Sequence, residues 1–231
     1  MTTFFQGGAA MQLLTENDFI DDGPFTIDDI FALPEGQRAE LIDGQIYDMA
    51  TPNRIHQTIS FSIARTIADH IDAKNGGCEV YMAPFAVIIQ NDIKNYVEPD
   101  ICIICDKDKL SDRGCEGAPD WIIEIVSPSS RKIDYIIKNT AYSRAGVREY
   151  WIVDPAKACT TVYDYDKDAA PTIIPFDQPV QCGIFPDLSI TVSDYLKEKM
   201  KYRLLWIYAK KSLQTGFSPK VCRDFLFMQV P

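Results

Sequence analysis

Isoleucines recur at every fourth position between Pro52 and Gly76, whereas the flanking segments alternate between apolar and polar residues. The stripe consists of Ile55, Ile59, Ile63, Ile67 and Ile71. Because side chains three to four residues apart share one face of an α-helix, this pattern predicts a single long amphipathic helix. Its apolar face should lie against a β-sheet.

Short apolar runs bounded by Pro, Asn, Asp or Gly predict β-strands on both sides of that helix. Before it, ELIDGQIYDM alternates around Asp43-Gly44, a dipeptide that supplies the positive φ angles of a tight hairpin turn. After it, the predicted strands span residues 79–82, 85–90, 97–105, 121–126, 149–153 and 160–165, and a hairpin-like region follows through residue 190.

Three shorter helices complete the prediction. Thr26 can cap a helix that ends at Pro34, Ser129 or Ser130 can cap one that Gly146 ends, and a last helix begins near residue 193 or 194. The apolar positions of the second helix are Ile133, Ile136, Ile137, Thr140 and Ala141. The order of elements predicts an α/β (α+β) fold with a mixed central β-sheet flanked by helices.

Composition and charge suit one domain with an extension. A chain of 231 residues, of which 46% are hydrophobic, can bury a full core. We expect a partly disordered leader over residues 1–24, a domain over residues 25–195 and a basic helical extension over residues 196–231. From Lys197 onward the chain has eight Lys or Arg and two acids, so this segment is basic. The whole chain has a net charge of −10, which argues against a broad basic surface that coats DNA and still allows a local basic groove.

The sequence also predicts where the protein resides. No apolar run approaches the roughly 20 residues that span a membrane, and the first residues lack the features of a secretory signal. We therefore expect a cytoplasmic protein without a membrane partner. Seven scattered cysteines fit reduced thiols better than disulfides. Cys102 and Cys105 should face opposite sides of a strand and lack a second pair, which argues against a zinc site.

Candidate chemistry gathers in the middle of the chain. Asp100 begins the strand ICIIC, Glu124 interrupts the apolar strand WIIEIV, and Lys138 lies on the following helix. A buried carboxylate is costly without a cation, a hydrogen-bond network or a raised pKa. If the two strands pair, the carboxylates converge and favour a divalent ion, Mg²⁺ or Mn²⁺. Such a site can hydrolyse phosphodiesters with metal-activated water, which Lys138 would orient.

The ordered set of motifs resembles a known family. ELIDG, VEPD, EIVSPSS, the pair Asp134 and Lys138, and AGVREYWIVDP are similar to motifs of the Uma-type family of putative restriction endonucleases. This family is a branch of the PD-(D/E)XK nuclease superfamily, and the resemblance spans roughly residues 25–195. It implies a restriction-endonuclease-like core and a metal-dependent endonuclease that acts on DNA.

The resemblance also implies roles for individual residues. Asp100 and Glu124 would bind the metal, the Ile125 carbonyl would add a ligand, and Glu40 would approach the same site from the first hairpin. By analogy with nucleases that make two cuts in a duplex, we expect a homodimer. The candidate contact surfaces are the strands near Tyr163 and the tail positions Leu204, Leu205, Ile207 and Tyr208.

The lysine departs from the superfamily pattern. In the standard motif it stands two residues after the acid, at the position that Val126 occupies here. In the Uma-type branch the lysine has moved to the following helix, and Lys138 matches that place. We therefore assign Lys138 the lysine role.

Each candidate also has a structural interpretation. Asp100 could be a polar strand start, Glu124 could form a buried ion pair, and Glu40 could be exposed on its hairpin. Lys138 could pair with Asp134 at the helix surface. On these interpretations the chain would be an inactive nucleic-acid-binding or protein-interaction member of the fold.

Three further residues are candidates for nucleic-acid binding. His56 opens the long helix and could contact a phosphate or a catalytic water, or could instead cap the helix or lie at the surface. Arg131 and Lys132 lie beside the candidate site and could grip a DNA backbone, or could be ordinary surface charge.

Overall fold

The isoleucine stripe forms the predicted long helix, α2 (Arg54–Ala73). Four of its isoleucines, from Ile59 onward, are buried, whereas Ile55 is 44% exposed. Each four-residue step advances the side chain about 40° beyond a full turn, so a stripe of this length cannot keep every member on one face. The assignment of Ile55 to the buried stripe is therefore wrong.

The chain is described by a computed structural model over residues 24–89, 92–167 and 169–196. Nearly all of the predicted leader (1–24) and extension (196–231) lies outside these ranges, as do the tail positions proposed for dimer contacts. The predicted last helix is represented by residues 192–196. No helix within the described ranges is long and apolar enough to span a membrane.

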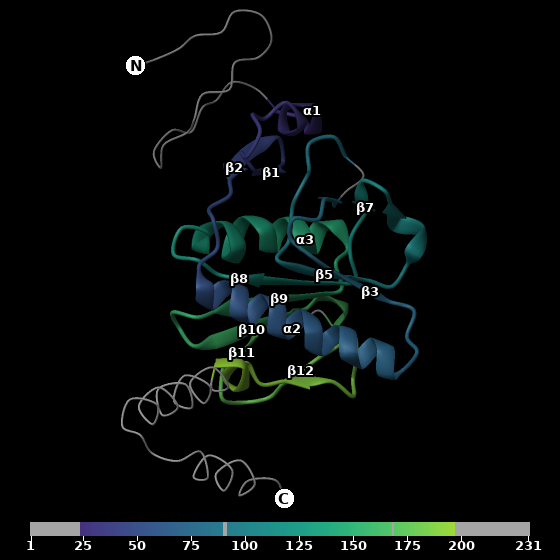
Figure 1. Ribbon diagram of the computed structural model, residues 1–231, viewed down its shortest axis with the longest axis vertical. Helices are drawn as coiled ribbons and strands as arrows, with labels where there is room; N and C mark the ends of the chain where they lie inside the picture. Colours follow the sequence, from purple (N-terminus) through teal and green to yellow (C-terminus); the bar gives the residue numbers. More distant parts are fainter. Residues whose placement is uncertain (1–23, 90–91, 168, 197–231) are drawn as a thin grey trace, which may run out of the picture.

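A six-stranded mixed sheet forms the centre of the structure, and Figure 1 shows it between α2 and α3 (Asn139–Ala145). Its strands are β3 (Glu79–Met82), β5 (Ile101–Ile104), β8 (Trp121–Ile125), β9 (Glu149–Asp154), β10 (Cys159–Asp164) and β11 (Thr172–Pro175). Their order is β11-β10-β9-β8-β5-β3, and only the neighbours β8 and β9 are parallel. The α/β fold class is confirmed.

The two faces of the sheet carry separate hydrophobic layers because side chains alternate along each strand. On one face Ile123 and Ile125 of β8 pack with the isoleucines of α2. On the other, Ile122 and Val126 pack with Tyr142 of α3. Glu124 belongs by its position to the α3 face and is itself buried.

Smaller elements cover one end of the sheet. Asp43 and Gly44 have the positive φ angles predicted for the hairpin, 52° and 78°. The elements are α1 (Ile27–Phe31), β1 (Ala39–Ile42), β2 (Gln45–Asp48), β4 (Val87–Ile88), η1 (Lys107–Lys109), β6 (Leu110–Ser111) and β7 (Gly114–Glu116).

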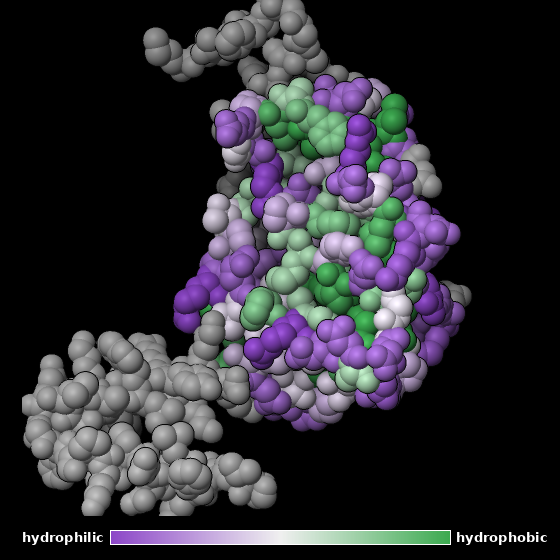
Figure 2. Space-filling model, turned by 45° about the vertical axis from the view of Figure 1, so that its right-hand side comes forward, coloured by the Kyte–Doolittle hydropathy of each residue, from purple (hydrophilic) through white to green (hydrophobic). Residues whose placement is uncertain are grey.

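Two predicted strands are shorter than expected. The strand predicted over residues 85–90 is only β4, and the one predicted over residues 97–105 is β5 plus a bridge from Val97 to Val87. Figure 2 shows hydrophobic surface at the α1 end, where Phe31 is among the exposed residues.

The last elements are η3 (Tyr165–Lys167), β12 (Val180–Gln181) and β13 (Ser189–Ile190). β12 and β13 form a separate antiparallel pair, as the hairpin-like pattern predicts. Their Val180 and Ile190 join the hydrophobic layer of α2.

Cys78 and Cys105 form a disulfide, which corrects the expectation of reduced thiols for this pair. The other described cysteines are free, as expected: Cys102, Cys115, Cys159 and Cys182. The antiparallel register pairs Glu79 with Ile104, so the two cysteines stand opposite each other just beyond the paired residues. Sequence spacing did not reveal this because the pairing is set by the sheet. Cys102 lies in the α3-side layer and Cys105 packs against the α2-side layer, which confirms that they face opposite ways.

The crossover between β8 and β9 begins with a π-helix, η2 (Ile133–Lys138), which continues into α3. Gly146 ends α3 with φ of 91°, as predicted. The buried face differs from the predicted one, because Asp134 and Lys138 point inward while Ile136 is 58% exposed. π-Helical turns shift side-chain positions relative to an α-helix and occur often at functional sites.

Asp154 at the end of β9 fastens this crossover to the sheet. Its fully buried carboxylate binds the Arg131 guanidinium through both oxygens, accepts a 3.2 Å bond from the Tyr135 hydroxyl, and accepts bonds from two backbone N–H groups of the next turn. Burial raises the pKa of this carboxyl, but Arg131 and the N–H donors outweigh burial and hold the pKa below its usual value.

Substitution Asp154→Asn should lower the free energy of unfolding by about 2 kcal/mol at pH 7, because the charge-assisted bonds to Arg131 are lost. The pKa of Asp154 is lowered in the folded state, so its contribution is present above about pH 4 and is lost as pH falls through the folded pKa. Urea unfolding at several pH values should show the deficit shrinking below about pH 4. The exposed Asp69→Asn on α2 is the matched control, and an equal effect there would contradict the assignment.

Candidate functional site

Sheet register brings the two predicted carboxylates together. Because Ile101 pairs with Ile123 in the antiparallel pair β5–β8, the next residues outward, Asp100 and Glu124, stand opposite each other. The Asp100 N–H donates to Glu124 Oε2 at 3.3 Å, and Asp100 Oδ2 accepts from the Ile125 N–H at 2.8 Å. The predicted convergence of Asp100 and Glu124 is therefore confirmed.

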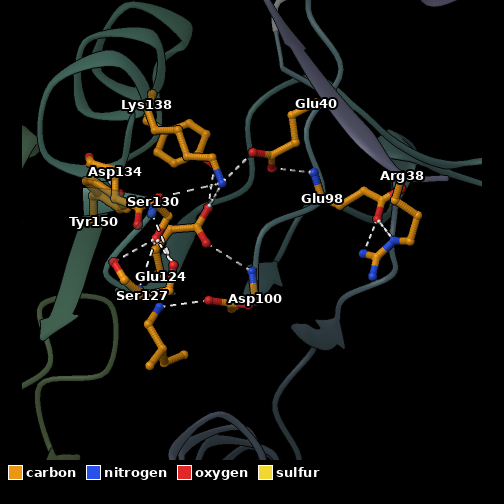
Figure 3. Close-up of polar contacts among 12 residues, drawn as sticks. Arg38, Glu40, Glu98, Asp100, Glu124, Ser127, Ser130, Asp134, Lys138 and Tyr150 are labelled. Atoms are coloured by element: carbon orange, nitrogen blue, oxygen red, sulfur yellow. Dashed lines mark hydrogen bonds and ion pairs between the residues drawn. The ribbon is translucent and has the colours of Figure 1, made fainter. Parts of the chain in front are cut away.

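Lys138 enters the same site from η2, as Figure 3 shows. Its Nζ lies 2.8 Å from Glu40 Oε2 and 2.8 Å from Glu124 Oε1. Only 5% of the lysine side chain is exposed, and Asp134 Oδ1 is 3.8 Å away. Lys138 and Asp134 are therefore not a surface pair, and the lysine points at the carboxylates as predicted.

Glu40 reaches the site from the β1–β2 hairpin and is buried rather than exposed. Its Oε1 accepts from the Glu98 N–H at 3.0 Å, while its Oε2 faces Lys138. Glu98 is held in turn by the Tyr96 hydroxyl and the Arg38 guanidinium. Both oxygens of Glu40 thus have partners, and its clearest role in this arrangement is to hold the lysine.

From the sequence, Tyr142 has no assigned role, and Asp134 is only a motif residue and a possible surface partner of Lys138. The Tyr142 hydroxyl donates to Glu124 Oε1 at 2.8 Å, and the Asp134 carboxylate is buried beside Lys138. Asp134, Lys138 and Tyr142 are spaced by four residues, the same period that identifies the stripe on α2. This polar repeat is the signal that could have revealed them. The flanking turn is closed by Ser127 and Ser130, each of whose hydroxyls accepts from the other's N–H.

The predicted nucleic-acid contacts occupy different places. His56 lies in the site, with Nε2 3.0 Å from Asp100 Oδ2. Arg131 is committed to Asp154 at the neighbouring strand end. Lys132 is exposed on the outer side of the crossover. Among these three, the structure brings only His56 to the carboxylates.

Burial and crowding set the charge state of the cluster. Burial raises the pKa of the Glu124 carboxyl well above its usual value, against the opposing effect of Lys138. Burial likewise raises the pKa of Asp134 to about 6. Burial lowers the pKa of Lys138, but the surrounding carboxyl groups of Glu124, Glu40 and Asp134 outweigh it and raise the value overall. The lysine is therefore an ammonium, and the carboxyl groups exceed the positive charge available to them.

The oxygen donors suit a small hard cation. Within the described residues, no group of three or more His, Cys, Asp or Glu side chains is arranged to hold a metal ion. Asp100 Oδ1 nevertheless has no hydrogen-bond partner in the described parts of the chain, and Glu124 Oε2 accepts only the 3.3 Å bond. Mg²⁺ commonly uses one or two carboxylates and completes its shell with water and phosphate. The pair Asp100 and Glu124 fits that pattern.

Val126 occupies the position of the lysine in the standard motif and is apolar and buried here. It follows Glu124 by two residues, shares its face of the strand, and is buried in the α3-side layer. A lysine at position 126 would meet that apolar layer, whereas η2 delivers Lys138 to Glu124 from above the sheet face.

Comparisons with known proteins identify the family and the fold of the chain. Residues 27–193 match the family Uma2, described as "Putative restriction endonuclease". The uncharacterized protein slr1290 of Synechocystis sp. is 26% identical over 133 residues, which cover 57% of this chain and 68% of that protein. A crystal structure of a putative nuclease belonging to DUF820 from Anabaena variabilis has a TM-score of 0.62 at 21% identity, covering 75% of this chain and 98% of the other, and so shares the fold. The chain belongs to the Uma2 family of putative restriction endonucleases.

Proposed function

We propose that the protein is a metal-dependent endonuclease that hydrolyses phosphodiester bonds of DNA. The observation that carries this proposal is the meeting of Asp100, Glu124 and Lys138 at one end of β5 and β8. An acid pair with spare oxygens beside an ammonium is an arrangement that metal-dependent phosphodiester hydrolysis can use. Membership of a family described by that activity supports the same conclusion.

Asp100 and Glu124 would hold Mg²⁺ or Mn²⁺, with the Ile125 carbonyl and Glu40 as the further predicted ligands. When bound, the ion would activate water and offset charge on the phosphate. The excess of carboxyl groups over ammonium groups favours a cation at this place, since it relieves their mutual repulsion. Asp100 is the more accessible acid, with 18% of its side chain exposed.

Lys138 would orient the attacking water or the scissile phosphate. Glu40 and Glu124 fix its ammonium from two sides, and Tyr142 fixes the Glu124 oxygen that the ammonium contacts. Such preorganised charge lowers a barrier because little reorientation is needed during reaction. His56 and Lys132 remain candidates for contact with the DNA backbone, as does Arg131 if it can leave Asp154.

Cleavage of plasmid DNA with Mg²⁺ or Mn²⁺ tests the proposal. Glu124→Ala and Asp100→Asn should each reduce the rate by about 100-fold or more, because metal stabilisation of the transition state contributes several kcal/mol. Metal should also raise the melting temperature of the wild type and not of Glu124→Ala. The control is Asp69→Asn, which should cut at the wild-type rate. Equal cleavage by all variants would contradict the assignment of Asp100 and Glu124 as metal ligands.

One observation favours a second candidate function, that of an inactive binding protein. Lys138 is almost fully buried and engaged by two carboxylates, which also describes a structural bridge. An inactive member would bind nucleic acid or a protein through the same fold.

Lys138→Met separates the two functions. If the lysine acts in catalysis, cleavage should fall by about 100-fold while Mn²⁺ still binds, because the metal-holding acids remain. Calorimetric titration and cleavage are compared below the melting temperature of the variant, with the exposed Lys94→Met as control. A wild type that binds DNA and never cleaves it would favour the binding protein instead.

The expected homodimer remains a prediction, as does a domain that ends at Tyr195. Among the described surfaces, the sheet edge at β11 presents the exposed side chain of Ile173, next to the strand that carries Tyr163. Light scattering after gel filtration should give twice the chain mass for the full-length protein. A shortened chain ending at Tyr195 should remain dimeric if β10 and β11 make the contact, and become monomeric if the tail makes it.

A further inference from the structure

The chain has two histidines, both on α2, and each contacts an aspartate through Nε2. His70 pairs with Asp187 at 3.2 Å near the end of the helix, away from the candidate site. His56 pairs with Asp100 at 3.0 Å in the first turn, with 11% of its side chain exposed. Both pairs join an imidazole to a carboxylate, but Asp187 is 54% exposed and also pairs with Lys74, whereas Asp100 is 18% exposed and is a proposed metal ligand.

Asp100 is held at one oxygen only. Its Oδ2 contacts His56 Nε2 and the Ile125 N–H, which approach from α2 and from β8. These two partners restrict rotation of the carboxylate about its side-chain bonds. Oδ1, the oxygen without a partner in the described parts of the chain, is left for another ligand.

We propose that His56 is a positioning residue that holds Asp100 Oδ2, so that Asp100 Oδ1 is presented to the divalent cation. The inference rests on the proposed function, because it assigns His56 a part in building that metal site. In this arrangement Nε2–H donates to the carboxylate, and His56 acts on the metal only through Asp100. Mutation of a residue that orients a metal ligand in this way typically lowers metal affinity by about 10- to 100-fold.

A packing role alone explains His56 poorly. Its Nδ1 is buried and has no hydrogen-bond partner among the residues that the structure describes, and a buried polar atom without a partner is costly. An apolar side chain would fill the same place without that cost. The contact of the other ring nitrogen, Nε2, with Asp100 therefore explains the presence of a histidine at this position. The helix cap does not need the imidazole either, since Asn53 Oδ1 accepts from the backbone N–H groups of Ile55 and His56.

Calorimetric titration of the full chain with Mn²⁺ tests this role without relying on cleavage. His56→Leu removes the donor and should weaken Mn²⁺ binding by at least about tenfold. His56→Gln keeps an N–H donor and should recover most of the affinity. His70→Leu removes the equivalent pair at the other end of α2 and should bind Mn²⁺ as the wild type does. A role in stability alone would lower the melting temperature without changing metal affinity.

Nuclear magnetic resonance provides a second measurement if His56→Leu fails to fold. In His70→Leu the only imidazole signals belong to His56, and saturating Mg²⁺ should shift them. Unchanged signals at saturation, or Mn²⁺ affinity of His56→Leu within about twofold of wild type, would overturn the inference while the nuclease proposal stands. A wild type that binds no Mn²⁺ would overturn both.

Discussion

The Lys138 ammonium is the contact on which the site depends, because it joins three parts of the fold. Glu40 comes from the hairpin that covers one end of the sheet, Glu124 from the central strand, and the lysine from the crossover helix. Removing one partner from such a buried group leaves an uncompensated charge, which typically costs about 3–5 kcal/mol. The hairpin, the sheet and the crossover are therefore fixed relative to one another by the same atoms that we assign to catalysis.

The arrangement brings more carboxyl groups together than one ammonium can neutralise. One ammonium faces Glu40, Glu124 and Asp134, and Asp100 adds a further carboxylate beside them. Burial disfavours the ionised acids, so the pKa values of Glu124 and Asp134 rise. The same crowding that is unfavourable in the metal-free protein would favour the proposed cation.

Hydrogen bonds from neighbouring groups hold the carboxylates that surround the long side chain of Lys138. Tyr142 fixes Glu124, the Glu98 N–H fixes Glu40, and both His56 and the Ile125 N–H fix Asp100. Each of the carboxylates Glu40, Glu124 and Asp100 therefore has one oxygen held by a group other than Lys138. Asp154 provides the same kind of support for the crossover, through Arg131 and Tyr135. Precise orientation of this kind is what electrostatic catalysis needs.

The sequence by itself determined the elements and the candidate acids. Periodicity located α2, the Asp43-Gly44 turn and the strands that carry Asp100 and Glu124, because local backbone preferences and the alternation of side chains are written in neighbouring residues. The tertiary structure alone decided which atoms meet. Register placed Asp100 opposite Glu124 and Cys78 opposite Cys105, and the π-helix turned Asp134, Lys138 and Tyr142 inward. The two pairings depend on the register between distant segments, which no local pattern encodes, whereas the four-residue spacing of Asp134, Lys138 and Tyr142 is a local signal that they share a face.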